Sequence, residues 1–212
     1  MFEIGKYITL KILRDTDPGL YLGKDTESEE VVLLPNKDKP KTFKIGDEIR
    51  VFIYLDYEER PIATTLKPFL NLNEFGYLRC VDVTNHGAYM DWGLEKHLFV
   101  PFNEQARPMK VDNWYVIYLY LDEQTNRLAG SSKTNQFLQN DNLTIKVYDE
   151  IDILITHLTE KGANVIINGL HKGLIYLEDI FEDIRTGDRL KAFVKNIRDD
   201  HKVDVVLQKQ GY

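Results

Sequence analysis

The sequence predicts a mainly β protein made of three small barrels in tandem. Short runs of β-branched and aromatic residues alternate with polar ones and end at Gly, Asn or Asp, which is typical of strands. One run recurs, because residues 51–55 and 117–121 share a pattern and are followed by Asp56 and Asp122, which lie 66 residues apart. Such an internal repeat indicates tandem modules. With 212 residues, the chain is long enough for three small domains.

The first and third copies support the same arrangement. Gly-Asp pairs at residues 46–47 and 187–188 precede matching strands, and Asp112 takes the place of the opening glycine in the second copy. Six residues after each opening residue stands an aromatic side chain that we expect to face outward, namely Phe52, Tyr118 or Phe193. Five short strands per copy with glycine-rich corners favour five-stranded antiparallel barrels of the oligonucleotide-binding (OB) type.

The repeat also sets the expected domain boundaries. We expect a divergent barrel over residues 1–66, a second barrel and its polar linker over 67–140, and a third barrel over 141–212. Short helical turns connect strands, and one is predicted in the third copy because apolar residues recur there at helical spacing. These residues are Leu177, Ile180, Phe181 and Ile184. The acids between them are expected to form a solvated face rather than a cation site.

Composition bounds the class of protein. Hydrophobic residues make up 43% of the chain and charged residues 29%, which argues for folded cores and against disorder. No apolar run approaches the ~20 residues of a membrane helix, and the first residues lack the profile of a signal peptide. The single cysteine, Cys80, fits a reducing compartment. We therefore expect a cytoplasmic monomer with no membrane partner.

No enzyme is predicted. The three serines include no Gly-x-Ser-x-Gly motif, and no glycine-rich phosphate loop with Lys-Ser/Thr is found. The five histidines lack i, i+4 pairing and nearby cysteines, so no zinc site is expected. The sequence thus predicts no catalytic residue, no metal and no cofactor.

The second copy resembles the S1 domain, an RNA-binding five-stranded barrel named after ribosomal protein S1. Residues 76–81 match its first strand, and the His-Gly-Ala-Tyr-Met-Asp segment 86–91 matches its second. Val100 stands where the family has a histidine. The third copy keeps Gly-Ala-Asn-Val at 162–165, with Asn164 in place of the exposed aromatic residue. The first copy is the most divergent.

Three such modules in this order resemble the conserved virulence factor B family of bacterial RNA-binding proteins. The resemblance covers essentially the whole chain and implies a regulatory RNA-binding protein. In that family a winged-helix domain follows the third barrel. Because this chain ends at Tyr212, the resemblance implies a fragment or a shortened member without that domain.

The resemblance also implies a face on which a single strand binds by base stacking and phosphate contacts. Alternation in the second strand of copy two directs Ala88, Met90 and Trp92 inward and leaves Tyr89 outward. Tyr89 is the first candidate for stacking, with His86 and Phe99 beside it. Arg79 and Arg127 are candidate phosphate contacts. Tyr118 is a further candidate, although it fits packing between modules equally well.

Two other functions stay open. The net charge of −7 weakens tight phosphate binding, and together with Asn164 it favours a protein-interaction adaptor whose barrels have lost nucleic-acid affinity. A single-stranded DNA binder is a third option, because the sequence points to no residue that would recognise a 2′-hydroxyl. The leading prediction is a protein that binds single-stranded RNA mainly through its second module, with a protein partner as the alternative.

Overall fold

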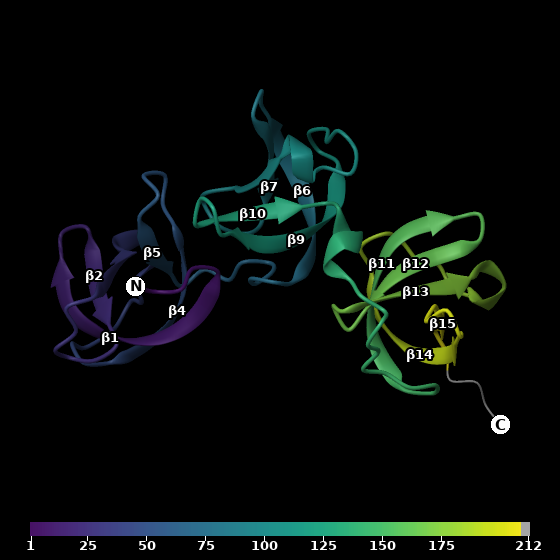
Figure 1. The fold of residues 1–212 in the computed structure, drawn as a ribbon. Coiled ribbons are helices and arrows are strands. Elements are labelled where there is room, and N and C mark those ends of the chain that lie inside the picture. Colours follow the sequence, from purple (N-terminus) through teal and green to yellow (C-terminus); the bar gives the residue numbers. More distant parts are fainter. Residues whose placement is uncertain (209–212) are drawn as a thin grey trace. The chain divides into compact units, whose positions relative to one another are not determined.

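The structure is a computed structural model that describes residues 1–208. Strands dominate these residues and form three five-stranded sheets, which follow one another along the chain from purple through teal to yellow (Figure 1). We call them the first, middle and third modules. The prediction of a mainly β chain with three five-stranded sheets is confirmed.

The first module is a closed barrel with the strand order β1-β2-β3-β5-β4. Its strands are β1 (Lys6–Thr16), β2 (Gly19–Gly23), β3 (Val31–Pro35), β4 (Glu48–Leu55) and β5 (Pro61–Thr64). Alternation along β4 places Val51 and Ile53 in the barrel core, where both side chains are fully buried. Phe52 therefore points away from that core.

The middle module is a sheet with the order β10-β9-β6-β7-β8. Its strands are β6 (Phe75–Val83), β7 (Gly87–Asp91), β8 (Leu98–Pro101), β9 (Trp114–Asp122) and β10 (Arg127–Ser131). Unlike the other two sheets, it is not closed by hydrogen bonds, and β8 and β10 form its edges. Ala88 and Met90 are fully buried, as alternation along β7 predicts.

The third module is again a closed barrel, with the order β11-β12-β13-β15-β14. Its strands are β11 (Glu150–Thr159), β12 (Gly162–Ile167), β13 (His171–Tyr176), β14 (Arg189–Ile197) and β15 (Val203–Val206). Its core is aliphatic, with Ile155, Val165 and Val205 among the buried side chains.

The chain divides into two compact units. Unit 1 comprises Met1–Glu74, Leu78–Asn113 and Leu119–Ser131, and unit 2 comprises Phe75–Tyr77, Trp114–Tyr118 and Ser132–Tyr212. The first module and most of the middle module thus belong to one unit. The finer boundaries at residues 66 and 140 stay a prediction.

The expectation of wholly antiparallel barrels is wrong at two strand pairs. β3 pairs with β5 in parallel through Leu33 and Ile62, and β13 pairs with β15 in parallel. The reason is geometric, because an odd number of strands cannot alternate in direction all the way around a closed barrel. One parallel pair must complete the ring.

The helical segments are limited to four single 3₁₀ turns within residues 1–208. They are η1 (Asn36–Asp38), η2 (Phe102–Glu104), η3 (Thr134–Phe137) and η4 (Leu177–Asp179). The predicted helical stripe in the third module is wrong beyond η4. Ile180 and Ile184 contact the barrel core from a non-helical segment, whereas Phe181 is 80% exposed. A segment this short gains too few hydrogen bonds to offset helix nucleation.

Phe52, one of the aromatic residues expected to face outward, is covered by side chains from outside its barrel core. Its ring lies off the first barrel's core, yet it is fully buried, because Trp92 and Tyr7 pack edge-on against it at 5.9 and 5.3 Å between ring centroids. Trp92 also contacts Tyr54. Trp92, which was expected to face the middle module's interior, is therefore buried against the first module instead.

Candidate nucleic-acid interface

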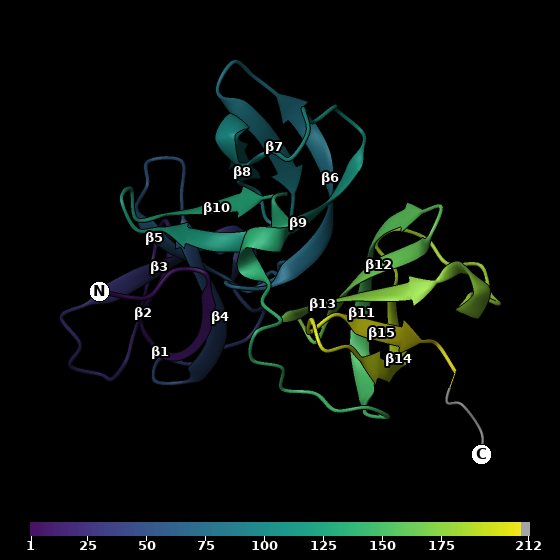
Figure 2. The same ribbon diagram turned by 45° about the vertical axis from the view of Figure 1, so that its right-hand side comes forward.

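A groove of about 910 Å³ in unit 1 collects aromatic side chains from the first and middle modules. Its lining residues come from β4 and the turn after it, and from β6, β7, β8, β9 and β10. Figure 2 shows β7 and β8 beside each other, the two strands that carry Tyr89 and Phe99. We call it the aromatic groove, after Tyr54, Tyr57, Tyr89, Trp92, Phe99 and Tyr120.

Tyr89 and Phe99 form an aromatic platform on this groove. They pair directly across β7 and β8, and their ring centroids lie 5.2 Å apart at an interplanar angle of 41°. Both side chains are half-buried, so each keeps surface open to a ligand. Rings at this separation touch each other, which leaves no room for a base between them. A base would therefore stack on the platform from outside.

Gly87 makes this close approach possible. A Cβ atom at residue 87 would lie 2.7 Å from Cε2 of Phe99 and 2.5 Å from the carbonyl oxygen of Val100. The glycine thus lets β8 and the Phe99 ring lie against the start of β7. The first and third modules use Gly19 and Gly162 at the same place against the carbonyls of Leu34 and Ile175.

The platform distinguishes the middle module from the other two. At the matching positions the first module pairs Tyr21 with Leu33. The third module pairs Asn164 with Leu174, and both line a hollow of about 440 Å³. Of the three modules, then, only the middle one has two aromatic rings paired at this place.

The cationic groups of the groove are already engaged. Arg127 on β10 forms an ion pair with Glu59. The Nζ atom of Lys96 donates to the carbonyl oxygen of Asp56 at 2.8 Å, and burial lowers the pKa of this amine. Few charges are therefore ready to meet phosphates, and the groove offers mainly aromatic surface.

The groove tyrosines supply neutral hydroxyls. Burial, with smaller effects of nearby carboxylates, raises the pKa of Tyr54 and of Tyr120 to about 12 each. Both phenols stay protonated at neutral pH and keep their O–H groups. Tyr57 is 73% exposed, and its hydroxyl donates to the carbonyl oxygen of Glu95 at 3.3 Å.

Four of the six predicted site residues line the groove, namely Tyr89, Phe99, His86 and Arg127. His86 is exposed in the turn before β7, where its backbone N–H donates to Thr84 Oγ1 at 3.2 Å. This turn brings the imidazole to the groove without fixing it in a network.

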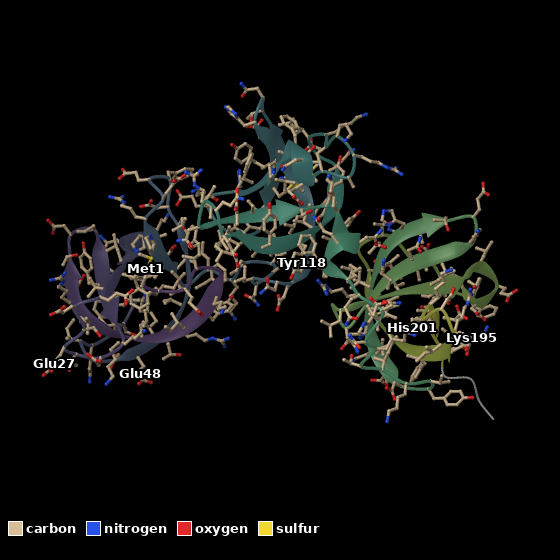
Figure 3. The ribbon with its side chains drawn as sticks, in the orientation of Figure 1. Met1, Glu27, Glu48, Tyr118, Lys195 and His201 are labelled. Carbon is tan, nitrogen blue, oxygen red and sulfur yellow. The ribbon has the colours of Figure 1, made fainter. Side chains whose placement is uncertain are left out.

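The other two predicted residues lie elsewhere. Arg79 on β6 forms an ion pair with Asp112 at 3.0 Å. Tyr118 on β9, labelled in Figure 3, stacks on Phe137 with ring centroids 4.0 Å apart and an interplanar angle of 18° and also contacts Phe75. Tyr118 also packs against a cluster of buried side chains that includes Leu154. The structure favours the packing alternative for Tyr118 and does not bring either residue to the aromatic groove.

Sequence reasoning missed several groove residues, among them Tyr54, Tyr57, Lys96, His97 and Tyr120. The repeat treats each module alone, whereas this groove needs side chains from two modules. The available signal was the aromatic pair at Tyr54 and Tyr57, which stands at the end of β4.

Residues 1–208 contain no group of three or more His, Cys, Asp or Glu side chains placed to hold a metal ion. Nor does any helix in that range have the length and apolar character of a membrane span.

Comparison with known proteins relates the first module to a known domain family. Residues 4–66 match the family model of the S1 domain. The first module is thus similar to the S1 domain. The matched part is the first module, in which the sequence motifs diverge most from the expected pattern.

Two further proteins match almost the full length of the chain. The uncharacterized protein YitL of Bacillus subtilis (strain 168) is 29% identical over 222 residues, covering 96% of this chain and 70% of YitL. A crystal structure from Streptococcus pneumoniae TIGR4, described as a multidomain protein with nucleic-acid-binding domains, matches with a TM-score of 0.54. It is 19% identical and covers 99% of this chain and 75% of its own. At that identity the structural match supports the fold alone.

Proposed function

We propose that this chain binds single-stranded RNA, with bases stacked on the Tyr89–Phe99 platform of the middle module. The observation that carries the proposal is the half-buried aromatic pair on the wall of a groove large enough for nucleotides. S1 domains support a nucleic-acid partner in general. Stacking on such rings contributes roughly 1–3 kcal/mol per base and tolerates any base, since each has a π-face.

A single strand suits this groove better than a duplex. Bases must be unstacked to reach aromatic side chains, and a duplex hides them. The engaged Lys96 and Arg127 and the net charge of −7 leave few contacts for a paired backbone. Binding by this route should therefore depend weakly on salt.

The proposal covers the wider role as well. We propose a monomeric cytoplasmic regulator that binds rather than catalyses, with single-stranded RNA as its nucleic-acid partner. A protein-interaction adaptor and a single-stranded DNA binder are the alternatives that the test below separates.

Fluorescence anisotropy of labelled single-stranded RNA, duplex RNA and single-stranded DNA over a salt series tests the proposal. We expect single-stranded RNA to bind best and Tyr89→Ala to weaken it by roughly 1–3 kcal/mol, the contribution of one stacked base. The plot of log K against log salt should have a shallow slope, near −0.7 per phosphate contact.

Phe181→Ala is the matched control, because it removes an aromatic ring that is 80% exposed and lies outside the groove. Its RNA affinity should equal that of the wild type. Tighter binding of DNA than RNA would favour the single-stranded DNA alternative. Absence of binding to any nucleic acid at low salt would favour the adaptor.

A further inference from the structure

Each module has a β-bulge in its first strand that fixes one residue opposite the platform position. The register places Arg14 across from Tyr21 in the first module and Asp82 across from Tyr89 in the middle module. His157 takes this place opposite Asn164 in the third. Because the bulge recurs at the same point, these three side chains occupy equivalent sites beside the position where a base would stack.

The first and middle modules differ most at this place. The Arg14 guanidinium lies over the Tyr21 ring, 4.4 Å from its centroid. It offers positive charge where a strand would bind. In the middle module the equivalent group is the Asp82 carboxylate, which is exposed and lines the aromatic groove. An acid here repels phosphate, so a favourable contact of this carboxylate has to be with another part of the nucleotide.

Asp82 differs from the other two acids of the groove, Glu59 and Asp122, in its place directly opposite Tyr89. Glu59 is paired with Arg127, and the Asp122 carboxylate accepts a hydrogen bond from the backbone N–H of Gln124. Asp82 Oδ1 accepts from the N–H of Val83 at 2.9 Å, whereas Oδ2 accepts no hydrogen bond within residues 1–208. One oriented acceptor thus stands beside the platform.

The chemistry of this acceptor distinguishes bases. An ionised carboxylate can only accept hydrogen bonds, and acidic side chains pair with the exocyclic amino group of cytosine. Uracil carries a carbonyl oxygen at that position, and two acceptors repel each other.

We propose that Asp82 makes the middle module select bases with an exocyclic amino group over uracil. This inference rests on the proposed stacking of a base on Tyr89. It adds that Asp82 distinguishes the stacked base by a hydrogen bond to the amino group on the edge of its ring.

Cytosine and uracil form the sharpest test, because their rings differ at the group that Asp82 would meet. We expect the wild type to bind oligocytidylate roughly tenfold more tightly than oligouridylate of the same length, the effect of one hydrogen bond to a charged group. In Asp82→Asn the amide can also donate to a carbonyl, so the ratio should fall to about one. Anisotropy with both oligonucleotides measures the ratio directly.

Asp91→Asn is the charge-matched control. Asp91 lies on β7 two residues from Tyr89 and does not line the groove, and its carboxylate accepts from the N–H of Gly93 at 3.0 Å, which an amide oxygen can also do. This variant should keep the wild-type ratio.

The outcomes separate this inference from the proposed function. If the wild type binds both oligonucleotides equally and Tyr89→Ala weakens both, the role of Asp82 is wrong while stacking stands. An equal gain for both oligonucleotides in Asp82→Asn would reduce Asp82 to simple repulsion and also overturn the inference. Failure of both oligonucleotides to bind would contradict the proposed function and the inference together.

Discussion

Replacing Phe52 with Ala should lower the free energy of unfolding of unit 1 by about 3–5 kcal/mol, the usual cost of truncating a buried phenylalanine. The side chain is fully buried between Tyr7 and Trp92, with edge-to-face contacts to both rings. Its loss leaves a cavity on the outside of a barrel whose own core is untouched. The loss of stability should therefore come from weaker packing of the first module against Trp92.

Hydrogen exchange followed by mass spectrometry resolves this effect by unit. In Phe52→Ala, peptides from β4 and β7 should lose protection, while peptides from β11 to β13 should keep theirs. Phe181→Ala should change the free energy of unfolding by less than about 0.5 kcal/mol, as expected for a surface position. Unchanged protection of β4 would show that Phe52 does not stabilise unit 1.

Removing both platform rings should have the largest effect on binding. Tyr89→Ala combined with Phe99→Ala should weaken single-stranded RNA binding by about 2–6 kcal/mol, because each ring contributes roughly 1–3 kcal/mol when a base stacks on it. The rings are tilted by 41° and in contact, so their outer faces can support neighbouring bases. The double variant should therefore bind more weakly than either single variant.

The matched control is Tyr21→Ala combined with Leu33→Ala, which removes the equivalent pair from the first module. Anisotropy should show a smaller loss for this variant, because its pair contains one ring. Melting temperatures should be measured for both double variants, so that loss of folding is not mistaken for loss of contacts. Equal losses of affinity would contradict the assignment of binding chiefly to the middle module.

The fold was largely predictable, because its signals are local. Strand alternation and the repeat of residues 51–55 at 117–121 predict three sheets, and three five-stranded sheets are found. The sequence analysis did not predict the parallel pairs β3–β5 and β13–β15. The relative direction of two strands that are distant in the sequence leaves no local pattern. The helical spacing from Leu177 to Ile184 misled because extended segments can also direct apolar residues to a core.

The candidate site was predictable only within one module. Tyr89, Phe99 and His86 follow from alternation and from resemblance to the S1 domain, and all three line the groove. Trp92 and Tyr57 reach it through packing between modules, which a repeat does not encode. Alternation shows only on which face of a sheet a side chain lies. Whether Phe52 and Tyr118 are exposed depends on the residues that pack over that face, which alternation does not predict.

Photocrosslinking tests the central claim most directly. The probe is single-stranded RNA carrying 5-iodocytidine, irradiated with the full chain and analysed by mass spectrometry of the crosslinked peptides. The account predicts adducts at Tyr89 or Phe99 that disappear in the double variant. Adducts confined to the third module or to Tyr21, with RNA still bound, would contradict it.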